Sequence, residues 1–176
     1  LTGRLVDWMR LQSIPPKKLI SASAIGYYGA SEDGVFSEEA PSGAGFSAEL
    51  CRQWEDEAVC AQKMGTVVTR LRLGVVFSSR GGALGKMTRA NQLGVESWLG
   101  TGSQWLSWVH ITDVVRAIQF VLGCHAPAAV YNLVAPEAVT HRMFAGEVAR
   151  HTGSTLRLGV QAFAVRWLAG EMADEL

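Results

Sequence analysis

The stretch Leu19–Gly29, which reads LISASAIGYYG, decides the fold class of this 176-residue chain. Its first half is a short apolar run, which is typical of a buried strand. The run passes through two small hydroxyl residues, Ser21 and Ser23, into a Gly-Tyr-Tyr-Gly loop. Open α/β sheets bind ligands beyond the carboxyl ends of their strands. The sequence therefore predicts a functional site at this loop.

Strands and helices alternate on both sides of this stretch. The strand around it is expected at Lys18–Ala24, and a long loop at Ile25–Gly45. Further strands are expected at Thr66–Phe77, Trp105–Ile111, Val130–Val134 and Thr155–Leu158. Helices are expected at Leu1–Gln12, Phe46–Met64, Ala83–Leu93, Val114–Leu122 and Ala162–Met172, and another is expected to run from a cap at Thr140 to His151. This alternation predicts an α/β fold with a mostly parallel sheet in a single domain, residues 1–176.

The helix expected at Phe46–Met64 carries apolar residues at helical spacing. That stripe consists of Phe46, Leu50, Trp54, Ala58 and Ala61. The charged residues of the helix, Glu55 among them, fall mainly on its other sides. The pattern predicts that Phe46 and Leu50 lie in the core and that Glu55 lies away from it.

The composition argues against several classes of protein. Sixteen Lys and Arg balance sixteen Asp and Glu, whereas a nucleic-acid binder normally has a basic face. No apolar run reaches the roughly 20 residues that a membrane helix needs, and the charged stretch Leu1–Arg10 is unlike a signal peptide. Three cysteines without a CxxC spacing indicate reduced thiols and a cytoplasmic location. Because His125, His141 and His151 lack ligand-like spacing, no metal site is expected.

Four ordered stretches, together with the one quoted above, carry a resemblance that covers nearly the whole chain. They are FSAELCRQWEDEA (Phe46–Ala58), LRLGVVFSSRGGALGKM (Leu71–Met87), LGTGSQWLSWVHITDVVRAI (Leu99–Ile118) and YNLVAPEAVT (Tyr131–Thr140). The chain resembles the atypical extended short-chain dehydrogenase/reductases of the "epimerase family protein" subgroup, which are sugar-nucleotide epimerase-like. The resemblance implies the second half of a Rossmann-like parallel sheet, with a small α/β substrate-side part at about residues 81–99 and 131–176.

Members of this family begin with a glycine-rich strand–turn–helix that holds the dinucleotide pyrophosphate on a helix N-terminus. This sequence contains no such element. By comparison with the family, the N-terminal dinucleotide-binding third is absent, and so is the segment beyond Met172. The resemblance implies NADP or NAD as cofactor of the intact parent protein.

At the position of the reaction centre, this sequence differs from the short-chain dehydrogenases that it resembles. Short-chain dehydrogenases act through a Tyr-x-x-x-Lys pair, whose four-residue spacing puts both side chains on one face of a helix. The matching positions here are Phe46 and Leu50, which have no proton to transfer and no charge. The family match makes Ser23 the best candidate for the substrate-facing hydroxyl, and Tyr28 is a candidate for the catalytic phenol. Each also has a structural alternative: Ser23 as a partner of backbone groups at the strand end, and Tyr28 as a packing residue with a satisfied hydroxyl, which is the commoner case for such a tyrosine.

Other positions correspond to the ligand-binding parts of the family. On the cofactor side the candidates are Ser21, Arg72, Gly74 and Val75. For Arg72, contact with a ligand and a structural ion pair are both open, because a buried arginine needs a partner. Substrate-side candidates are Lys86, which could meet a phosphate, and His110, which titrates near neutrality.

Two functions remain open from the sequence. One is an NAD(P)-dependent epimerase or oxidoreductase that acts on a nucleotide-sugar-like or another small carbonyl or hydroxyl substrate. The other is a non-catalytic NADP-binding protein or an inactive fragment. The expected partner is a small molecule and neither a nucleic acid nor a membrane; the oligomeric state is not indicated.

Overall fold

The computed structural model describes residues 1–31, 34–82, 84–85, 88 and 94–160. They form two compact units, and the single-domain organisation expected from the sequence stays a prediction. The first unit contains Leu1–Gly74 and Thr112–Leu133, and the second contains Val75–Ile111 and Val134–Leu176, of which 134–160 are described. The alternation of strands and helices does not by itself predict this division, because it does not indicate which sheet each strand joins.

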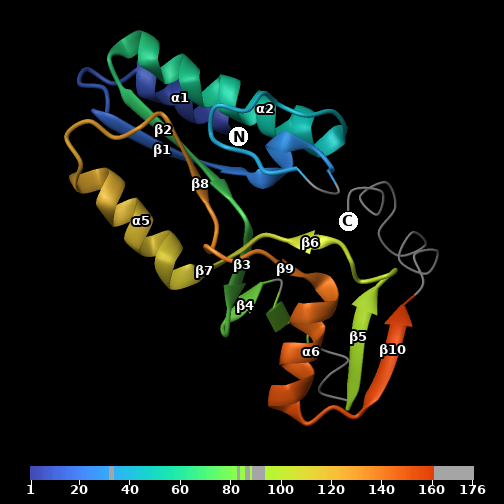
Figure 1. Ribbon diagram of the computed structural model, residues 1–176. Helices are drawn as coiled ribbons and strands as arrows, with labels where there is room; N and C mark the ends of the chain where they lie inside the picture. The colour runs from blue at the N-terminus through green and yellow to red at the C-terminus, as the bar shows by residue number, and fades with distance from the viewer. Residues whose placement is uncertain (32–33, 83, 86–87, 89–93, 161–176) are drawn as a thin grey trace. The chain divides into compact units, whose positions relative to one another are not determined.

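A sheet of three parallel strands forms the centre of the first unit (Figure 1). In order, its strands are β1 (Lys18–Ala24), β2 (Val67–Leu73) and β8 (Val130–Leu133). Ser23 of β1 lies opposite Arg72 of β2, which lies opposite Asn132 of β8. The parallel α/β fold is therefore confirmed, and the carboxyl ends of the three strands meet at one edge.

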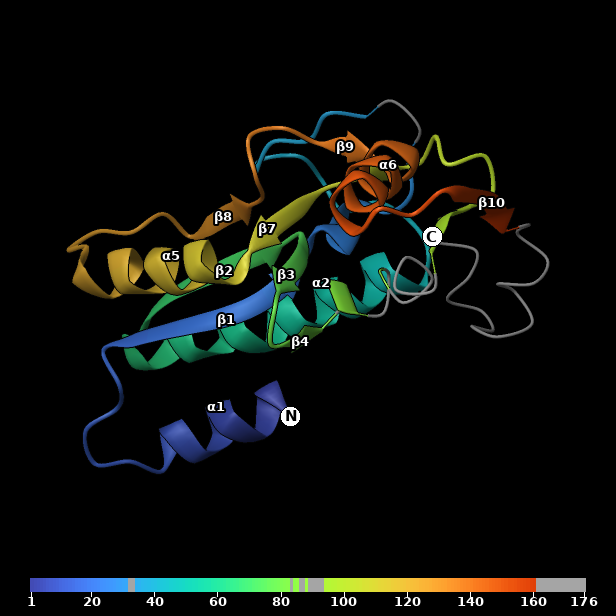
Figure 2. The same cartoon turned by 90° about the horizontal axis from the view of Figure 1, so that it is seen from below.

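Helices cover both faces of this sheet (Figure 2). On one face lie α1 (Thr2–Arg10) and α2 (Phe46–Val59), which continues as the 3-10 turn η2 (Cys60–Met64). On the other face lies α5 (Ile111–Gly123). The Nζ of Lys18, at the start of β1, donates to the carbonyls of Leu122 and Cys124 at 2.6 Å each. Lys18 thereby satisfies carbonyl groups that the end of α5 leaves without helical partners.

The core between α1, α2 and the sheet is built from small and medium apolar side chains. Its buried members are Val6, Met9, Ala58, Ala61 and Val68. Alanines on α2 and η2 let these elements approach the sheet closely, so that α1 can bury its two large side chains against them.

The apolar stripe that the sequence predicts on α2 does not face the core. The buried residues of α2 are Ala48, Cys51, Glu55 and Ala58. Phe46 is 63% exposed and Leu50 is half-buried, so the prediction that both lie in the core is wrong. Nine residues of helix turn the backbone by about 900°, which places Phe46 opposite Glu55. Once Glu55 faces inward, Phe46 must face outward.

The strand expected at Thr66–Phe77 is divided at Gly74 into β2 and β3 (Val75–Ser78). The amide of Gly74 donates to the carbonyl of Leu133, the last residue of β8, at 3.1 Å. The amide of Val75 donates to the Ser107 carbonyl at 2.9 Å, so the next residue already pairs in the second unit.

The described residues of the second unit form short strands and the helix α6. The strands are β3, β4 (Gly81–Gly82), β5 (Val95–Leu99), β6 (Trp105–Leu106), β7 (Trp108–His110), β9 (Val139–Thr140) and β10 (Leu156–Val160). They pair as β4-β3-β7, β6-β9 and β10-β5. Helix α6 (His141–Thr152) begins as the sequence predicts, because the Thr140 hydroxyl accepts a hydrogen bond from the Met143 amide at 3.2 Å.

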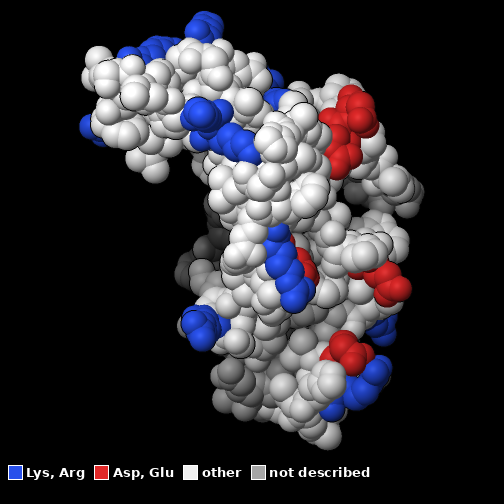
Figure 3. Space-filling view, turned by 90° about the vertical axis from the view of Figure 1, so that its left-hand side faces the viewer, with Lys and Arg blue, Asp and Glu red and all other residues white. Residues whose placement is uncertain are grey.

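The helices expected at Ala83–Leu93 and Ala162–Met172 fall largely or wholly outside the described residues. Among the helices that the structure describes, none has the length and apolar character to span a membrane. On the face shown in Figure 3, lysine and arginine side chains of the described residues stand in small separate groups, some of them beside aspartate or glutamate side chains.

The packing of α1 gives a direct test of the core. Replacing Met9, which is 2% exposed, by alanine should lower the free energy of unfolding by about 2–5 kcal/mol, because it leaves a cavity between two helices and the sheet. Leu11→Ala, at a site 83% exposed, is the control and should change it by less than about 0.5 kcal/mol. Urea denaturation measures both values, and equal losses would contradict this packing.

Candidate functional site

The loop after β1 turns back on itself at the carboxyl edge of the sheet. The 3-10 turn η1 (Ile25–Tyr28) ends at Gly29, whose φ of 72° favours glycine. The amide of Gly43 then donates to the Tyr27 carbonyl at 2.9 Å, and a Cβ on Gly43 would collide with the Tyr28 backbone. These contacts return the long loop to its starting point, where α2 begins.

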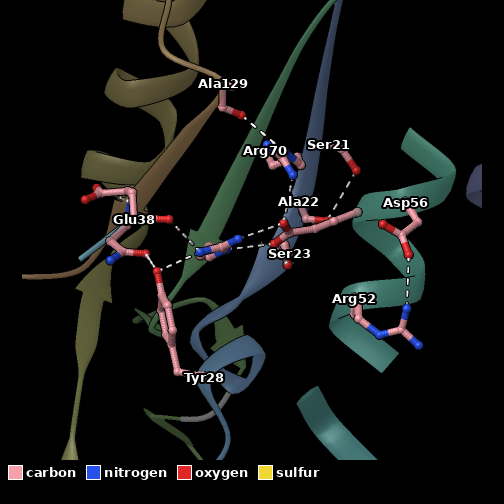
Figure 4. Close-up of polar contacts among 12 residues, drawn as sticks. Ser21, Ala22, Ser23, Tyr28, Glu38, Arg52, Asp56, Arg70 and Ala129 are labelled. Carbon is pink, nitrogen blue, oxygen red and sulfur yellow. Dashed lines mark hydrogen bonds and ion pairs between the residues drawn. The ribbon is translucent and has the colours of Figure 1, made fainter. Parts of the chain in front are cut away.

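A single buried carboxylate, that of Glu55, organises the site. Its side chain is 3% exposed. It accepts hydrogen bonds from Arg72 at 2.8 Å (Nε) and 2.9 Å (Nη2), from the Ser23 hydroxyl at 2.8 Å, and from Arg70 Nη1 at 3.2 Å. Glu55 therefore links α2 to both β1 and β2, and Figure 4 shows Ser23 and Tyr28 directed at the same polar cluster.

The guanidinium of Arg72 connects this carboxylate to η1 and the loop. Its Nη1 donates to the Tyr28 hydroxyl at 2.8 Å and to the Glu38 carbonyl at 3.2 Å. The Tyr27 ring lies over the guanidinium, with 3.4 Å between the guanidinium carbon and the ring centroid. Arg72 is 2% exposed, and these partners explain how a cation is accommodated there.

Asn132 of β8 completes the network. A guanidinium can only donate hydrogen bonds, so the Tyr28 hydroxyl accepts from Arg72 and uses its own proton to donate to Asn132 Oδ1, at 2.6 Å. The backbone amide of Asn132 donates to Glu38 Oε1 at 2.8 Å, and its side-chain Nδ2 donates to the Phe36 carbonyl at 3.1 Å. One strand residue thus holds both Tyr28 and the loop.

The electrostatics follow from burial and pairing. Burial by itself would raise the pKa of Glu55, but hydrogen bonds from Arg72 and Ser23 and the charges of Arg72 and Arg70 lower it below its ordinary value. Burial by itself would lower the pKa of Arg72, but Glu55 and Tyr28 raise it. Burial raises the pKa of the Cys51 thiol on the same helix. Glu55 and Arg72 are therefore both charged near neutral pH.

Of the residues predicted from the sequence, Ser23, Tyr28 and Arg72 lie together. Ser21 lies on the same face of β1, is half-buried and donates to the Ala22 carbonyl at 3.4 Å. Gly74 is buried at the end of β2. Their predicted roles toward a ligand stay predictions. For Arg72, the structure supplies the ion-pair partner that no neighbouring residue in the sequence offered.

The remaining predicted residues lie elsewhere. Val75 and His110 belong to the second unit, where Val75 pairs with Trp108 and Phe77 with His110. Val75 is half-buried and His110 is exposed. Lys86 lies outside the described residues. No group of three or more His, Cys, Asp or Glu residues in the described part of the chain is placed to hold a metal ion.

The sequence analysis missed Glu55, Glu38 and Asn132. A signal for Glu55 was present, because Ala48, Cys51 and Ala58 form a stripe of small residues that includes it at helical spacing. Small residues suit a helix face that lies close to a sheet. Glu38 and Asn132 carried no comparable signal, because their contacts join residues 94 positions apart.

Comparison with known proteins places the chain among epimerase-like sequences. The family model described as "NAD dependent epimerase/dehydratase family" matches residues 1–134. An Arabidopsis thaliana protein named epimerase family protein SDR39U1 homolog, chloroplastic, is 42% identical over 179 residues, which cover 98% of this chain and 50% of that protein. An epimerase family protein of Mycobacterium bovis is 40% identical over 157 residues, or 89% of this chain and 52% of that protein. The chain thus spans about half the length of these relatives.

Solved structures show the same fold. The human epimerase family protein SDR39U1, solved with NADPH, superposes with a TM-score of 0.90 at 26% identity, covering 99% of this chain and 60% of that one. A nucleoside-diphosphate sugar epimerase from Corynebacterium glutamicum superposes with a TM-score of 0.76 at 26% identity, covering 99% and 40%. The Rossmann-like fold is confirmed.

Two glycine-containing stretches of the second unit, Gly81–Gly82 and Gly100–Gly102, do not fit the phosphates of a dinucleotide. These phosphates call for backbone amides of a glycine-rich turn between a strand and a helix. Gly81 and Gly82 instead form β4 in an antiparallel pair, and Gly100 and Gly102 lie in the turn before β6. At Gly102 the space is taken, because a Cβ there would lie 2.8 Å from atoms of both Trp98 and Arg142.

Removing the central carboxylate should destabilise the protein. Glu55→Gln leaves Arg72 and Arg70 without a counter-charge, and we expect a loss of about 3 kcal/mol or more in the free energy of unfolding at pH 7. Urea denaturation provides the measurement. The matched control is Glu49→Gln on the same helix, whose exposed pair with Arg52 should contribute less than about 1 kcal/mol.

Comparing the stability of wild type and Glu55→Gln at different pH values tests the lowered pKa of Glu55. Because the folded-state pKa lies below the ordinary value of 4.5, its stabilisation is complete above pH 4.5 and is lost as the pH falls through the lowered pKa. The difference between wild type and Glu55→Gln should narrow over that acidic range. A difference that stays constant from pH 7 down to strongly acidic pH would contradict the assignment.

Proposed function

Because the chain belongs to the NAD dependent epimerase/dehydratase family, we propose that it forms part of an NAD(P)-dependent epimerase or oxidoreductase. Its proposed substrate is nucleotide-sugar-like or another small molecule with a carbonyl or hydroxyl group. The observation that carries the proposal is the polar network of Ser23, Glu55, Arg72 and Tyr28 at the carboxyl edge of a parallel sheet. This edge is where open α/β sheets bind their ligands.

Tyr28 is the proposed acid/base group. Phe46 and Leu50 cannot transfer a proton, whereas Tyr28 combines a phenol with a cation that donates to it at 2.8 Å. A Tyr-x-x-x-Lys pair supplies the same combination of a phenol and a cation. Here the cation, Arg72, is on the strand β2, whereas the lysine of that pair is on a helix. Ser23 is the second proposed hydroxyl, and Glu55 fixes its orientation at 2.8 Å.

The proposed cofactor of the whole protein is NADP or NAD, in line with the NADPH in the human structure. The cofactor would supply hydride transfer. We propose that a glycine-rich segment outside this sequence holds its phosphates, while Ser21, Gly74 and Val75 lie toward the nicotinamide. The ion pair with Glu55 favours a structural role for Arg72 over direct cofactor contact.

On the substrate side, Lys86, His110 and the elements at about residues 81–99 and 131–176 remain proposals, as does a cytoplasmic location. The described residues of these two stretches belong to the second unit, except for residues 131–133. The Arabidopsis relative is chloroplastic by name, so localisation of a tagged protein in its own cells is the test that separates the two compartments.

Titration with NADPH tests the cofactor proposal. We expect no binding by this chain and clear binding by a version extended at its N-terminus with a glycine-rich strand–turn–helix of the kind that the family resemblance implies, measured by calorimetry. Thermal unfolding curves establish that both proteins are folded. If both are folded and neither binds, the cofactor proposal fails.

A specific observation favours a second candidate, a protein that binds the dinucleotide without turnover. Both candidate hydroxyls are already used inside the protein: Ser23 donates to Glu55, and Tyr28 donates to Asn132. Tyr28 is also only 7% exposed. In this alternative the network is purely structural, and Phe46 and Leu50 mark a lost reaction centre.

Restoring the missing pair separates the two candidates. Phe46→Tyr with Leu50→Lys, made in the extended protein, places a phenol and an ammonium one helical turn apart at sites that are exposed and half-buried. If Tyr28 is the acid/base group, NADPH oxidation with a panel of carbonyl substrates should not increase, and Tyr28→Phe should lower it by roughly 100-fold or more.

The control is Phe46→Tyr alone, which adds the phenol without the cation. A gain in NADPH oxidation by the double variant, over a wild type without turnover, would support the second candidate and contradict the role of Tyr28.

A further inference from the structure

The loop that follows η1 covers the Tyr28 ring. We define the cover as Gly34–Gly43. The Phe36 ring stacks on the Tyr28 ring, with centroids 5.0 Å apart and planes 8° from parallel. Phe36 is itself 38% exposed, whereas Tyr28 is 7% exposed. A side chain that solvent reaches therefore separates Tyr28 from solvent.

The cover is held by polar contacts at a few points. Asn132 binds it twice, through the Glu38 carboxylate and the Phe36 carbonyl, and Arg72 binds the Glu38 carbonyl. Its two ends are fixed by Gly34, whose amide donates to the Ser31 hydroxyl at 2.9 Å, and by Gly43.

Apolar packing contributes little to holding the cover. Val35 is 98% exposed, and Ser37, Glu39 and Pro41 are exposed as well. Segments with few buried apolar contacts open at a small cost compared with global unfolding. The cover can therefore open while the sheet and the Glu55–Arg72 pair stay intact.

We infer that the cover gates the Tyr28 hydroxyl and that Asn132 is the positioning residue that fastens it closed. This inference rests on the proposed function in treating Tyr28 as the reacting phenol. In the closed state the Tyr28 proton is directed at Asn132 Oδ1. In the open state a ligand oxygen can reach the phenol and compete with Asn132 Oδ1 for its proton, while Arg72 still donates to the phenol oxygen. The ligand chemistry that fits is a carbonyl or hydroxyl oxygen.

Two substitutions open the cover by different routes. Asn132→Asp keeps an acceptor for Tyr28 but replaces the Nδ2 donor by an oxygen that faces the Phe36 carbonyl. Phe36→Ala removes the stacked ring at an exposed position, so it leaves the fold intact. The matched control is Tyr131→Phe, which removes a phenol on the same strand as Asn132 whose contact is local, to the Ala128 amide at 2.9 Å.

The measurements use this chain without cofactor. Hydrogen exchange of the amides in 34–43 should become about tenfold faster in Asn132→Asp, the size expected for losing a hydrogen bond and gaining a repulsion. Nitration by tetranitromethane, located by mass spectrometry, should rise about tenfold at Tyr28 in Asn132→Asp and Phe36→Ala, with Tyr27 as the internal reference. Tyr131→Phe should leave both rates unchanged.

Unchanged nitration of Tyr28 in Phe36→Ala, or unchanged exchange of the cover in Asn132→Asp, would overturn the inference. If Asn132→Asp loses its fold, the nitration rates of all tyrosines rise together, and Phe36→Ala then decides. Failure here leaves the NADPH titration untouched, and failure of that titration leaves the gating result untouched.

Discussion

The buried ion pair between Glu55 and Arg72 is the interaction on which the first unit depends. Each charge loses its hydration on folding, a cost that only close and well-directed partners offset. The pair meets this condition with two parallel hydrogen bonds of 2.8 and 2.9 Å. Its two residues also bind Ser23 of β1, Tyr28 of η1 and Glu38 of the following loop. All three precede Glu55 and Arg72 by 17 or more positions in the sequence. The carboxyl edge of the sheet is therefore held together by this ion pair and its hydrogen bonds, with the rings of Tyr27 and Phe36 stacked on the network.

This pair also explains why α2 presents an apolar face to the outside. Glu55 must face Arg72, and the helical repeat then turns Phe46 about 180° away from it. The face that a Tyr-x-x-x-Lys pair would occupy carries Phe46 and Leu50 instead.

The sequence was sufficient where local patterns decide the structure. The strand at Lys18–Ala24 has the bounds expected from its apolar run, and Thr140 caps α6 as its side-chain chemistry predicts. It was insufficient where contacts between distant residues decide. Hydropathy places Glu55 in solvent, because a single carboxylate has no apolar signal, and only the fold brings Arg72 to it. The break between β2 and β3 at Gly74 likewise depends on strands that lie far along the chain.

The coupling between Glu55 and Arg72 tests this account most directly. A double-mutant cycle with Glu55→Gln and Arg72→Met, followed by urea denaturation at pH 7, measures the interaction free energy of the pair free of each residue's other contacts. We predict a coupling of about 2 kcal/mol or more, since each single substitution strands a buried partner and the double one strands neither. A coupling near zero would mean that the two residues stabilise the protein independently, and it would contradict the central place given to the pair.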